Sequence, residues 1–346
     1  MLSPRLRSLA TAVPSHILDQ AEVRRYAATL FGDRGDIARL LPVFENAGIC
    51  RRYSCVPIEW YSREHGWVDR TDIYLRCAVD LLEDVTLSCL RDAGLSRDSI
   101  DAIAVVSTTG IATPSLDALL VERMGLRRDI RRLPIFGLGC AGGVTGLARA
   151  GDLAKAAPGS KVLFLVVELC ALTFRRNDLD KSNLVATALF GDGAAGAIIS
   201  TEGEGPRLSA AGEYTWPDSL DIMGWDIAED GLKARFARNI PALVRDGMGD
   251  MVAEFLKRHA LTLRDIDRFA CHPGGAKVLD ALEAVFGLEP GQLAESREIL
   301  RDYGNMSAAT ALFVLARMNW RAASQRILLS ALGPGFSASF LVLDGE

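Results

Sequence analysis

Continuous apolar runs alternate along the chain with amphipathic stretches, a pattern typical of α/β proteins. Residues 160–168 (SKVLFLVVE) and 325–333 (QRILLSALG) are apolar over most of their length, which predicts strands buried on both faces. Each run follows a stretch of small and apolar residues with helical periodicity, at 137–150 and 302–317. The alternation predicts a sheet covered by helices on both faces.

The pattern occurs twice, with about 165 residues between matching segments. Residues 98–107 match 265–273, and residues 191–200 match 333–343 at a smaller offset, because the first half contains an extra excursion at roughly 170–190. The order in each half is helix, strand, helix, turn, helix, strand, turn, strand. We therefore predict two similar α/β halves, 1–205 and 206–346.

The repeat places three chemically versatile side chains at matching positions. Cys140 and Asn305 both stand where a glycine-containing turn opens a helix, and His272 follows the strand that mirrors 102–107. Strand ends and helix openings are where α/β folds place ligands and catalytic groups. We therefore expect the three side chains to converge on one site.

The turn around Cys140 (PIFGLGCAGG) has three interpretations. Gly137, Gly139 and Gly142 match a dinucleotide-binding fingerprint, with Glu168 as the acid after the next strand, but this acid comes late and a single GxGxxG is weak evidence. Alternatively, Cys140 is a nucleophile at a helix N-terminus, where the macrodipole favours a thiolate. The third interpretation is a small buried side chain in a packing turn.

Composition narrows the function classes. The 346 residues are 49% hydrophobic and 24% charged with a net charge of −5, which gives no electrostatic reason to expect a nucleic-acid partner. No run approaches the roughly 18 apolar residues of a membrane span, and the N-terminal stretch is too broken for a secretion signal. The seven cysteines lack paired spacing, so we expect reduced thiols, a cytoplasmic location and no metal site.

Five motifs resemble the type III polyketide synthases, the chalcone and stilbene synthase family: FGLGCAGG, ALFGDGAA, CHPGGAKVLDAL, DYGNMSAAT and LGPGFSASF. The likeness extends over nearly the whole chain and is specific, because the Cys, His and Asn motifs occur together. It resembles the bacterial type most. The family implies the thiolase fold, two αβα halves in a five-layer αβαβα arrangement. It also implies a homodimer in which the loop TTGIATP, around Thr113, reaches across the interface.

The resemblance also implies a role for each central residue. Cys140 would take an acyl group from an acyl-CoA starter, with its thiolate held by a His272 imidazolium. His272 and Asn305 would donate hydrogen bonds to the thioester oxygen of malonyl-CoA as CO2 leaves. The resulting carbanion would extend the acyl chain, which then cyclises. This chemistry needs CoA thioesters as substrates and no cofactor or metal.

Further positions follow from the same resemblance. Phe190 matches one of two phenylalanines at the pocket mouth, and the second falls on Ala234, which predicts an opening that admits a fatty acyl starter. Other positions that would line the pocket are Thr113, Trp225, Cys170, Thr173 and Ser307. CoA would be bound by Arg39, Arg51 and Arg52, whose guanidinium groups suit its phosphates, and by Gly274 and Gly275.

The sequence leaves several functions open. The leading interpretation is synthesis of an alkylpyrone, alkylresorcinol or related product from an acyl-CoA and malonyl-CoA. The alternatives are a malonyl-only synthase of phloroglucinol or tetrahydroxynaphthalene type and an initiating ketoacyl-ACP synthase. A protein of another class, which binds acyl thioesters without catalysis, would lack acylation of Cys140.

Overall fold

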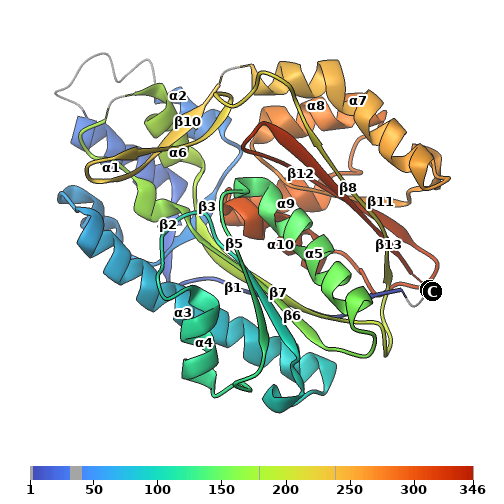
Figure 1. Cartoon of the computed structure of the whole chain (residues 1–346). Coiled ribbons are helices and arrows are strands. Elements are labelled where there is room, and N and C mark those ends of the chain that lie inside the picture. Colours follow the sequence, from blue (N-terminus) through green and yellow to red (C-terminus); the bar gives the residue numbers. More distant parts are fainter. Residues whose placement is uncertain (1–2, 32–40, 179, 238, 346) are drawn as a thin grey trace.

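Nine strands form one mixed sheet in the order β11-β12-β13-β8-β1-β7-β6-β4-β5 (Figure 1). The structure is a computed structural model that describes residues 3–31, 41–178, 180–237 and 239–345. The strands are β1 (Arg5–Ala12), β4 (Ala102–Val106), β5 (Arg131–Ile135), β6 (Val162–Leu169), β7 (Asp192–Ser200), β8 (Arg207–Thr215), β11 (Arg268–Cys271), β12 (Arg326–Gly333) and β13 (Ser337–Asp344).

The nine-stranded sheet consists of two sheets joined at one corner. β1 and β8 pair through Arg5 and Arg207. On one side of this junction lie the five strands of the first half, and on the other side lie β8, β13, β12 and β11 of the second half. The apolar runs predicted as buried strands are β6 and β12, and their residues are almost all buried.

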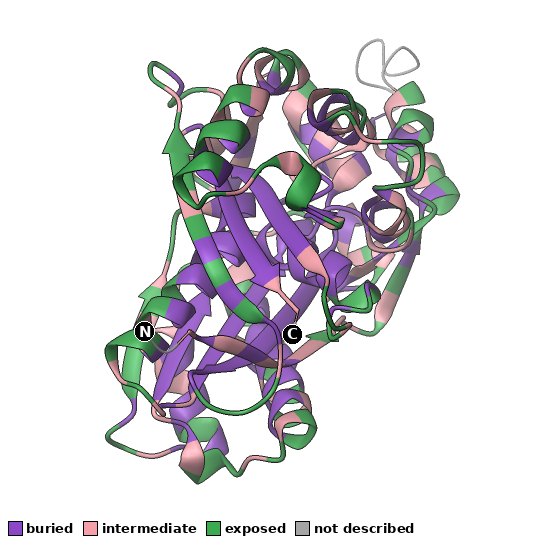
Figure 2. Ribbon diagram, turned by 90° about the vertical axis from the view of Figure 1, so that its right-hand side faces the viewer, coloured by how far each residue is buried: buried purple, intermediate pink, exposed green. Residues whose placement is uncertain are grey.

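Helices complete five layers, as the sequence predicted. α3 (Trp67–Ala93) and α4 (Leu116–Met124) cover the outer face of the first sheet. α5 (Gly142–Ala156) and α10 (Thr310–Arg317) lie between the two sheets, and α7 (Ile240–Arg258) and α8 (Ala276–Phe286) cover the outer face of the second. Three hydrophobic cores separate these layers. The strands β4, β6, β7, β12 and β13 are buried along most of their length (Figure 2).

The N-terminal ends of the two middle helices, α5 and α10, lie close to each other. A Cβ on Gly143, at the start of α5, would lie only 2.1 Å from the carbonyl oxygen of Ala308 in the turn η7 (Ser307–Ala309) before α10. Glycine permits this backbone approach because it has no Cβ. The crossing brings the Cys140 turn of one half beside the Asn305 turn of the other.

The halves differ in two places. Before its helix-opening turn the first half has the short strand β5, whereas the second has α9 (Ala294–Tyr303). The excursion that the sequence indicated at roughly 170–190 is not a plain loop, because it forms the turn η5 (Cys170–Thr173) and the helix α6 (Lys181–Leu189).

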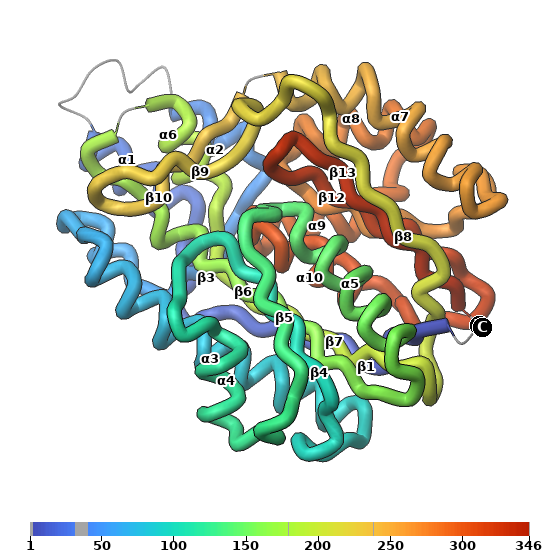
Figure 3. The backbone as a smooth tube through the Cα atoms, viewed as in Figure 1, coloured from blue at the N-terminus to red at the C-terminus, as the bar shows by residue number. Residues whose placement is uncertain are grey.

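The remaining elements form a cap at one end of the layers. The cap comprises α1 (Gln20–Phe31), α2 (Pro42–Asn46), the pair β2 (His16–Asp19) and β3 (Arg51–Ser54), the turn η2 (Ile58–Ser62), and the hairpin β9 (Met223–Ala228) and β10 (Gly231–Phe236). α6 contacts α1, α2 and β10, so segments distant in sequence meet there (Figure 3). Short turns η3 (Arg97–Ser99) and η6 (Leu263–Asp265) precede β4 and β11. Among the described helices, none is long and apolar enough to cross a membrane.

Candidate active site

Cys140 lies in the turn η4 (Gly139–Ala141) that opens α5, and it is 7% exposed. Gly139 has φ of +48°, a left-handed conformation that favours glycine, and its N–H donates to Thr108 Oγ1 at 3.1 Å. Thr108, which follows β4, therefore holds the turn in place. The turn keeps the Cys140 thiol at the N-terminal end of α5.

Asn305 belongs to a short backbone bridge between the two halves. Its N–H donates to Leu189 O at 2.8 Å and its carbonyl accepts from Gly191 N–H at 3.0 Å. Its side-chain Oδ1 accepts from Ser307 N–H at 2.8 Å and from the Cys140 thiol at 4.0 Å, and its Nδ2 donates to Gly274 O at 3.4 Å. Because an amide nitrogen carries two N–H groups, Nδ2 keeps a second donor for a ligand.

His272 extends β11 by one residue. Its N–H donates to Ser330 O at 2.8 Å, which continues the parallel pairing with β12, and the residue is 4% exposed. Neither ring nitrogen has a hydrogen-bond partner among the described residues. A buried imidazole whose two nitrogens lack hydrogen bonds lowers the stability of the folded protein. The ring of His272 is therefore available to a group that enters the site.

The three side chains line one cavity of about 780 Å³, which we call the main cavity. Gly274 and Gly275 also line it, as do Leu189, Phe236 and Leu332. The convergence predicted from the repeat is therefore observed. A cavity of this size has room for a drug-sized ligand.

Burial sets the protonation states of the two titratable groups. Burial raises the pKa of the Cys140 thiol to about 12 and lowers the pKa of His272 to about 3. Burial thus opposes the charged form of each group in the empty site. The expected pair of a thiolate and an imidazolium stays a prediction.

Glu168 is a further buried acid beside the site, at the end of β6. Its Oε2 accepts from Thr108 N–H at 3.0 Å and Thr109 Oγ1 at 2.8 Å, whereas Oε1 has no partner among the described residues. Burial is the main cause that raises its pKa to about 7. The sequence offered Glu168 only as the acid of a dinucleotide fingerprint, and its enclosure by threonine donors argues against a ribose there.

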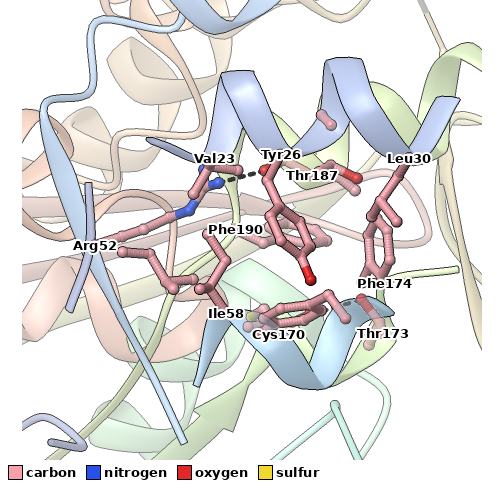
Figure 4. Close-up of a pocket in the computed structure, with 15 residues that line it drawn as sticks. Val23, Tyr26, Leu30, Arg52, Ile58, Cys170, Thr173, Phe174, Thr187 and Phe190 are labelled. Atoms are coloured by element: carbon pink, nitrogen blue, oxygen red, sulfur yellow. Dashed lines mark hydrogen bonds between the residues drawn. The ribbon is translucent and has the colours of Figure 1, made fainter. Parts of the chain in front are cut away.

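A second, smaller cavity is lined in part by Cys170 and Phe190. We call it the rear pocket; its volume is about 50 Å³. Figure 4 shows its two sides, with Val23, Tyr26 and Leu30 of α1 facing Cys170, Thr173 and Phe174. Burial is the main cause that raises the pKa of the Cys170 thiol, and the neighbouring Glu168, Asp192 and Cys140 add to it.

The aromatic wall differs from the expected one. Ala234 is buried among Cys170, Ala186 and Phe190, and Phe236, two residues further along β10, lines the main cavity. The Phe236 ring packs 5.7 Å from that of Phe190, and Trp225 packs on Phe190 at 5.8 Å. Alternate residues of a strand share a face, so this signal was present in the sequence and was missed.

Of the three arginines that were expected to bind the CoA phosphates, the two that the structure describes do not line the main cavity. Arg52 is 2% exposed, and its guanidinium donates to the carbonyls of Thr187 and Ala188 at the end of α6. Its prediction as a phosphate ligand is wrong, because it caps a helix inside the cap. Arg51 is exposed on β3 and does not line the main cavity, and Arg39 lies outside the described residues.

Two lysines that were not predicted from the sequence lie at the edge of the main cavity. Lys181 opens α6, and Lys277 lies in the first turn of α8, directly after Gly274 and Gly275. Both are exposed. The sequence indicates the place of Lys277, because it follows His272 closely in CHPGGAK. A helix that begins next to a strand end keeps its first turn near the site.

Ser307 and Thr113 complete the predicted residues. Ser307 is buried with φ of +46°, a left-handed conformation that is strained for a serine and that aims its N–H at Asn305. Thr113 is exposed in the loop before α4 and lines neither cavity of this single chain. A contact of Thr113 with a second chain therefore stays a prediction.

Comparison with known proteins places the chain in a family. The family model of chalcone and stilbene synthases, N-terminal domain, matches residues 5–203, and that of the C-terminal domain matches residues 207–344. The chain is 38% identical to a 1,3,6,8-tetrahydroxynaphthalene synthase from Streptomyces peucetius subsp. caesius, over 96% of this chain and 91% of that protein. It is 27% identical to an alpha-pyrone synthesis polyketide synthase-like protein, Pks18, of Mycobacterium tuberculosis, over 98% and 90%.

A solved structure gives the same result. The crystal structure of a 1,3,6,8-tetrahydroxynaphthalene synthase from Streptomyces coelicolor A3(2), a bacterial type III polyketide synthase, superposes with a TM-score of 0.94 at 31% identity and covers 99% of both chains. The five-layer arrangement is therefore the thiolase fold. The chain belongs to the chalcone and stilbene synthase family and is an acyltransferase, a bacterial type III polyketide synthase.

Proposed function

We propose that this enzyme loads an acyl group from an acyl-CoA starter onto Cys140 and extends it with malonyl-CoA by decarboxylative condensation. The observation that supports this most is the convergence of Cys140, His272 and Asn305 on the main cavity. A nucleophile, a proton acceptor and an amide donor are the groups that the reaction requires. Cofactors and metals play no part in the proposal.

Acylation begins from the neutral pair. As Cys140 Sγ attacks the thioester carbonyl, a nitrogen of His272 accepts the thiol proton, so the charges form only when the substrate has displaced water. The carbon–sulfur bond to CoA then breaks, and the imidazolium returns its proton to the departing CoA thiolate. The unpaired ring nitrogens of His272 fit this role, since they are free to accept.

Extension uses the same donors. The malonyl-CoA thioester oxygen would receive hydrogen bonds from Asn305 Nδ2 and from a ring N–H of His272, which stabilise the enolate formed when the bond to the carboxylate breaks and CO2 leaves. The enolate carbon attacks the acyl thioester, a carbon–carbon bond forms, and Cys140 is released. Ser307 N–H holds Asn305 in the donating orientation.

We propose a fatty acyl starter and an alkylpyrone or alkylresorcinol type of product. The support is the rear pocket, which is lined mainly by apolar side chains and includes Cys170 and Phe190 in its lining. Because the pocket is narrow in this structure, an alkyl tail would enter it only when the Phe190 ring turns. Burial of each methylene there favours the long starter by about 0.8 kcal/mol.

A malonyl-only reaction is the second candidate. It is favoured by the likeness to two tetrahydroxynaphthalene synthases, whose names state their product. Such a synthase would leave the rear pocket to the growing polyketide and would form product with malonyl-CoA as sole substrate.

We propose that Lys181 and Lys277 receive the CoA phosphates at the edge of the main cavity. Asp180 also lines this edge, but Lys233 pairs with it, so the two lysines dominate the local charge.

We further propose a cytoplasmic homodimer that pairs through β5. This strand ends the sheet, its residues are largely exposed, and the apolar side chains of Phe136 and Ile111, 60% and 49% exposed, lie beside it. An unpaired strand edge of this kind is a template for a second chain.

The experiment is incubation with malonyl-CoA and acyl-CoAs from acetyl to stearoyl, followed by liquid chromatography with mass detection. Wild-type protein should form acyl-Cys140 and products whose mass increases with the starter. Cys140→Ala should form neither, whereas Cys50→Ser, which changes an exposed thiol, should leave both unchanged.

Products from malonyl-CoA alone would favour the second candidate. Acylation that occurs only with carrier-protein thioesters would favour a ketoacyl-ACP synthase. Failure of every thioester to acylate Cys140 would refute the catalytic role and favour a binding protein.

A further inference from the structure

Arg52 is buried in the cap, and its side chain lies against the backbone bridge that carries Asn305. The bridge pairs Phe190 with Asn305, and a glycine adjoins each of them, Gly191 in one segment and Gly304 in the other. A Cβ on Gly191 would lie 3.2 Å from the Cβ of Arg52, and a Cβ on Gly304 would lie 3.4 Å from it. The stem of Arg52 therefore packs on both segments of the bridge.

The guanidinium of Arg52 holds the first segment. It donates to the carbonyls of Thr187 and Ala188 at the C-terminal end of α6, where the last carbonyls of a helix have no partner within the helix. The next carbonyl, that of Leu189, accepts from Asn305 N–H at 2.8 Å. Burial lowers the pKa of Arg52 to about 10, which leaves the guanidinium charged at neutral pH. Its bonds to the negative end of the helix dipole are therefore charge-assisted.

β3 and the residue before it hold the second segment. Cys50 N–H donates to Arg301 O at 2.8 Å near the end of α9, and the ring of Tyr53 stacks on that of Tyr303 with their centres 5.4 Å apart. α9 ends at Tyr303, two residues before Asn305. The short strand β3 thus contacts both segments that meet at the bridge.

We propose that Arg52 is a positioning residue for Asn305. It does not line the main cavity. It fixes the end of α6, where Leu189 O and Gly191 N–H bind the backbone of Asn305 and so set the place of its Nδ2. The inference rests on the proposed function, in which Nδ2 donates to the thioester oxygen of malonyl-CoA. Loss of the two helix-end bonds should therefore slow decarboxylation far more than acylation, which uses the thiol and the imidazole.

The test measures these two steps in Arg52→Met, which keeps most of the stem and removes the donors. Decarboxylation is followed as CO2 released from malonyl-CoA without a starter, and acylation as the single-turnover mass gain of Cys140 with acetyl-CoA. Arg52 also lines the rear pocket, so both substrates lack a long alkyl tail. We expect kcat for decarboxylation to fall about a hundredfold, with KM and the acylation rate within about threefold of wild type.

Arg52→Lys and Gly212→Ala are the controls. A lysine keeps the charge but lacks the fork that reaches two carbonyls, so we expect decarboxylation at about a tenth of the wild-type rate. In Gly212→Ala, on β8, the added Cβ would lie 2.5 Å from the ring of Phe255 on α7. This change destabilises the second sheet without touching the bridge, so it should lower both rates in the same proportion.

Several results would overturn the proposal. One is a fall in decarboxylation and acylation by equal factors in Arg52→Met, as in Gly212→Ala. Another is a double variant, Arg52→Met with Asn305→Ala, that decarboxylates more slowly than Asn305→Ala, because a residue that acts through the amide adds nothing once the amide is gone. Should Arg52→Met fail to fold by circular dichroism, Arg52→Lys decides by the same ratio of rates.

Asn305→Ala separates this inference from the proposed function. If Asn305→Ala decarboxylates malonyl-CoA like wild type, the proposed role of Asn305 is refuted and the positioning role with it. If Asn305→Ala is slow while Arg52→Met is normal, the role of Asn305 stands and the positioning role alone is refuted. Slow decarboxylation in both variants, with acylation retained in Arg52→Met, is the expected result.

Discussion

Replacement of Glu168 by glutamine should change how folding stability depends on pH. The carboxyl is buried, only Oε2 has donors, and its pKa is about 7 against an ordinary 4.5. Between these two values the folded protein binds more protons than the unfolded chain, so the free energy of unfolding falls as pH rises through this range. The difference in pKa corresponds to a loss of about 3 kcal/mol once pH exceeds 7.

The assay is urea unfolding of wild type and Glu168→Gln at about pH 5 and about pH 8. Glutamine cannot ionise but keeps an oxygen for the two threonine donors, so the variant should gain about 3 kcal/mol relative to wild type between these conditions. The comparison removes the contribution of Asp192, whose pKa burial raises to about 6, because it is present in both proteins. If the difference in the free energy of unfolding between the two proteins stays constant with pH, Glu168 does not carry a buried charge that lacks compensation.

Three further predictions concern packing, specificity and substrate binding. Gly143→Ala should lower the free energy of unfolding by about 3 kcal/mol, because its Cβ meets the Ala308 carbonyl at 2.1 Å; urea unfolding measures it. Phe236→Ala should raise the kcat/KM ratio of long over short acyl-CoA starters by about tenfold in product assays, since it removes the ring facing Phe190. Lys277→Glu should raise KM for malonyl-CoA by about tenfold with kcat within about twofold, because it repels the phosphates.

Each of these has a matched control. Gly66→Ala places a Cβ in open space and should cost far less than Gly143→Ala; equal losses would show that the helix crossing is not tight. Phe236→Leu should give an intermediate starter preference, and no change in either variant would exclude the ring as a barrier. Lys257→Glu alters an exposed lysine on α7 away from the cavity, and an equal rise in KM there would indicate a general charge effect.

The layers and the central residues could be predicted because they follow from patterns that repeat. Continuous apolar runs identify β6 and β12, and the repeat aligns the helix-opening turns of Cys140 and Asn305. The position of Cys140 or Asn305 within its βα unit depends on the local sequence. Comparing the two halves of one chain is therefore enough to identify it.

The missed features depend on contacts between distant segments. Nothing near Arg52 in the sequence indicates that the end of α6 would enclose it. Phe236 replaces the bulk absent at Ala234 only because both share a face of β10 and meet Phe190. The burial of Cys140 and His272, which shifts the pKa of each toward its neutral form, depends on both halves, and a motif does not describe it.

The shared middle layer has a consequence for biosynthesis on the ribosome. β1, made among the first residues, packs against α10, which is made near the end of the chain. Until α10 emerges, the inner face of the first sheet lacks half of its cover and remains apolar and exposed. Nascent chains of this enzyme therefore need either rapid completion or a chaperone on that face, and truncation before residue 310 should yield aggregates rather than a free N-terminal half.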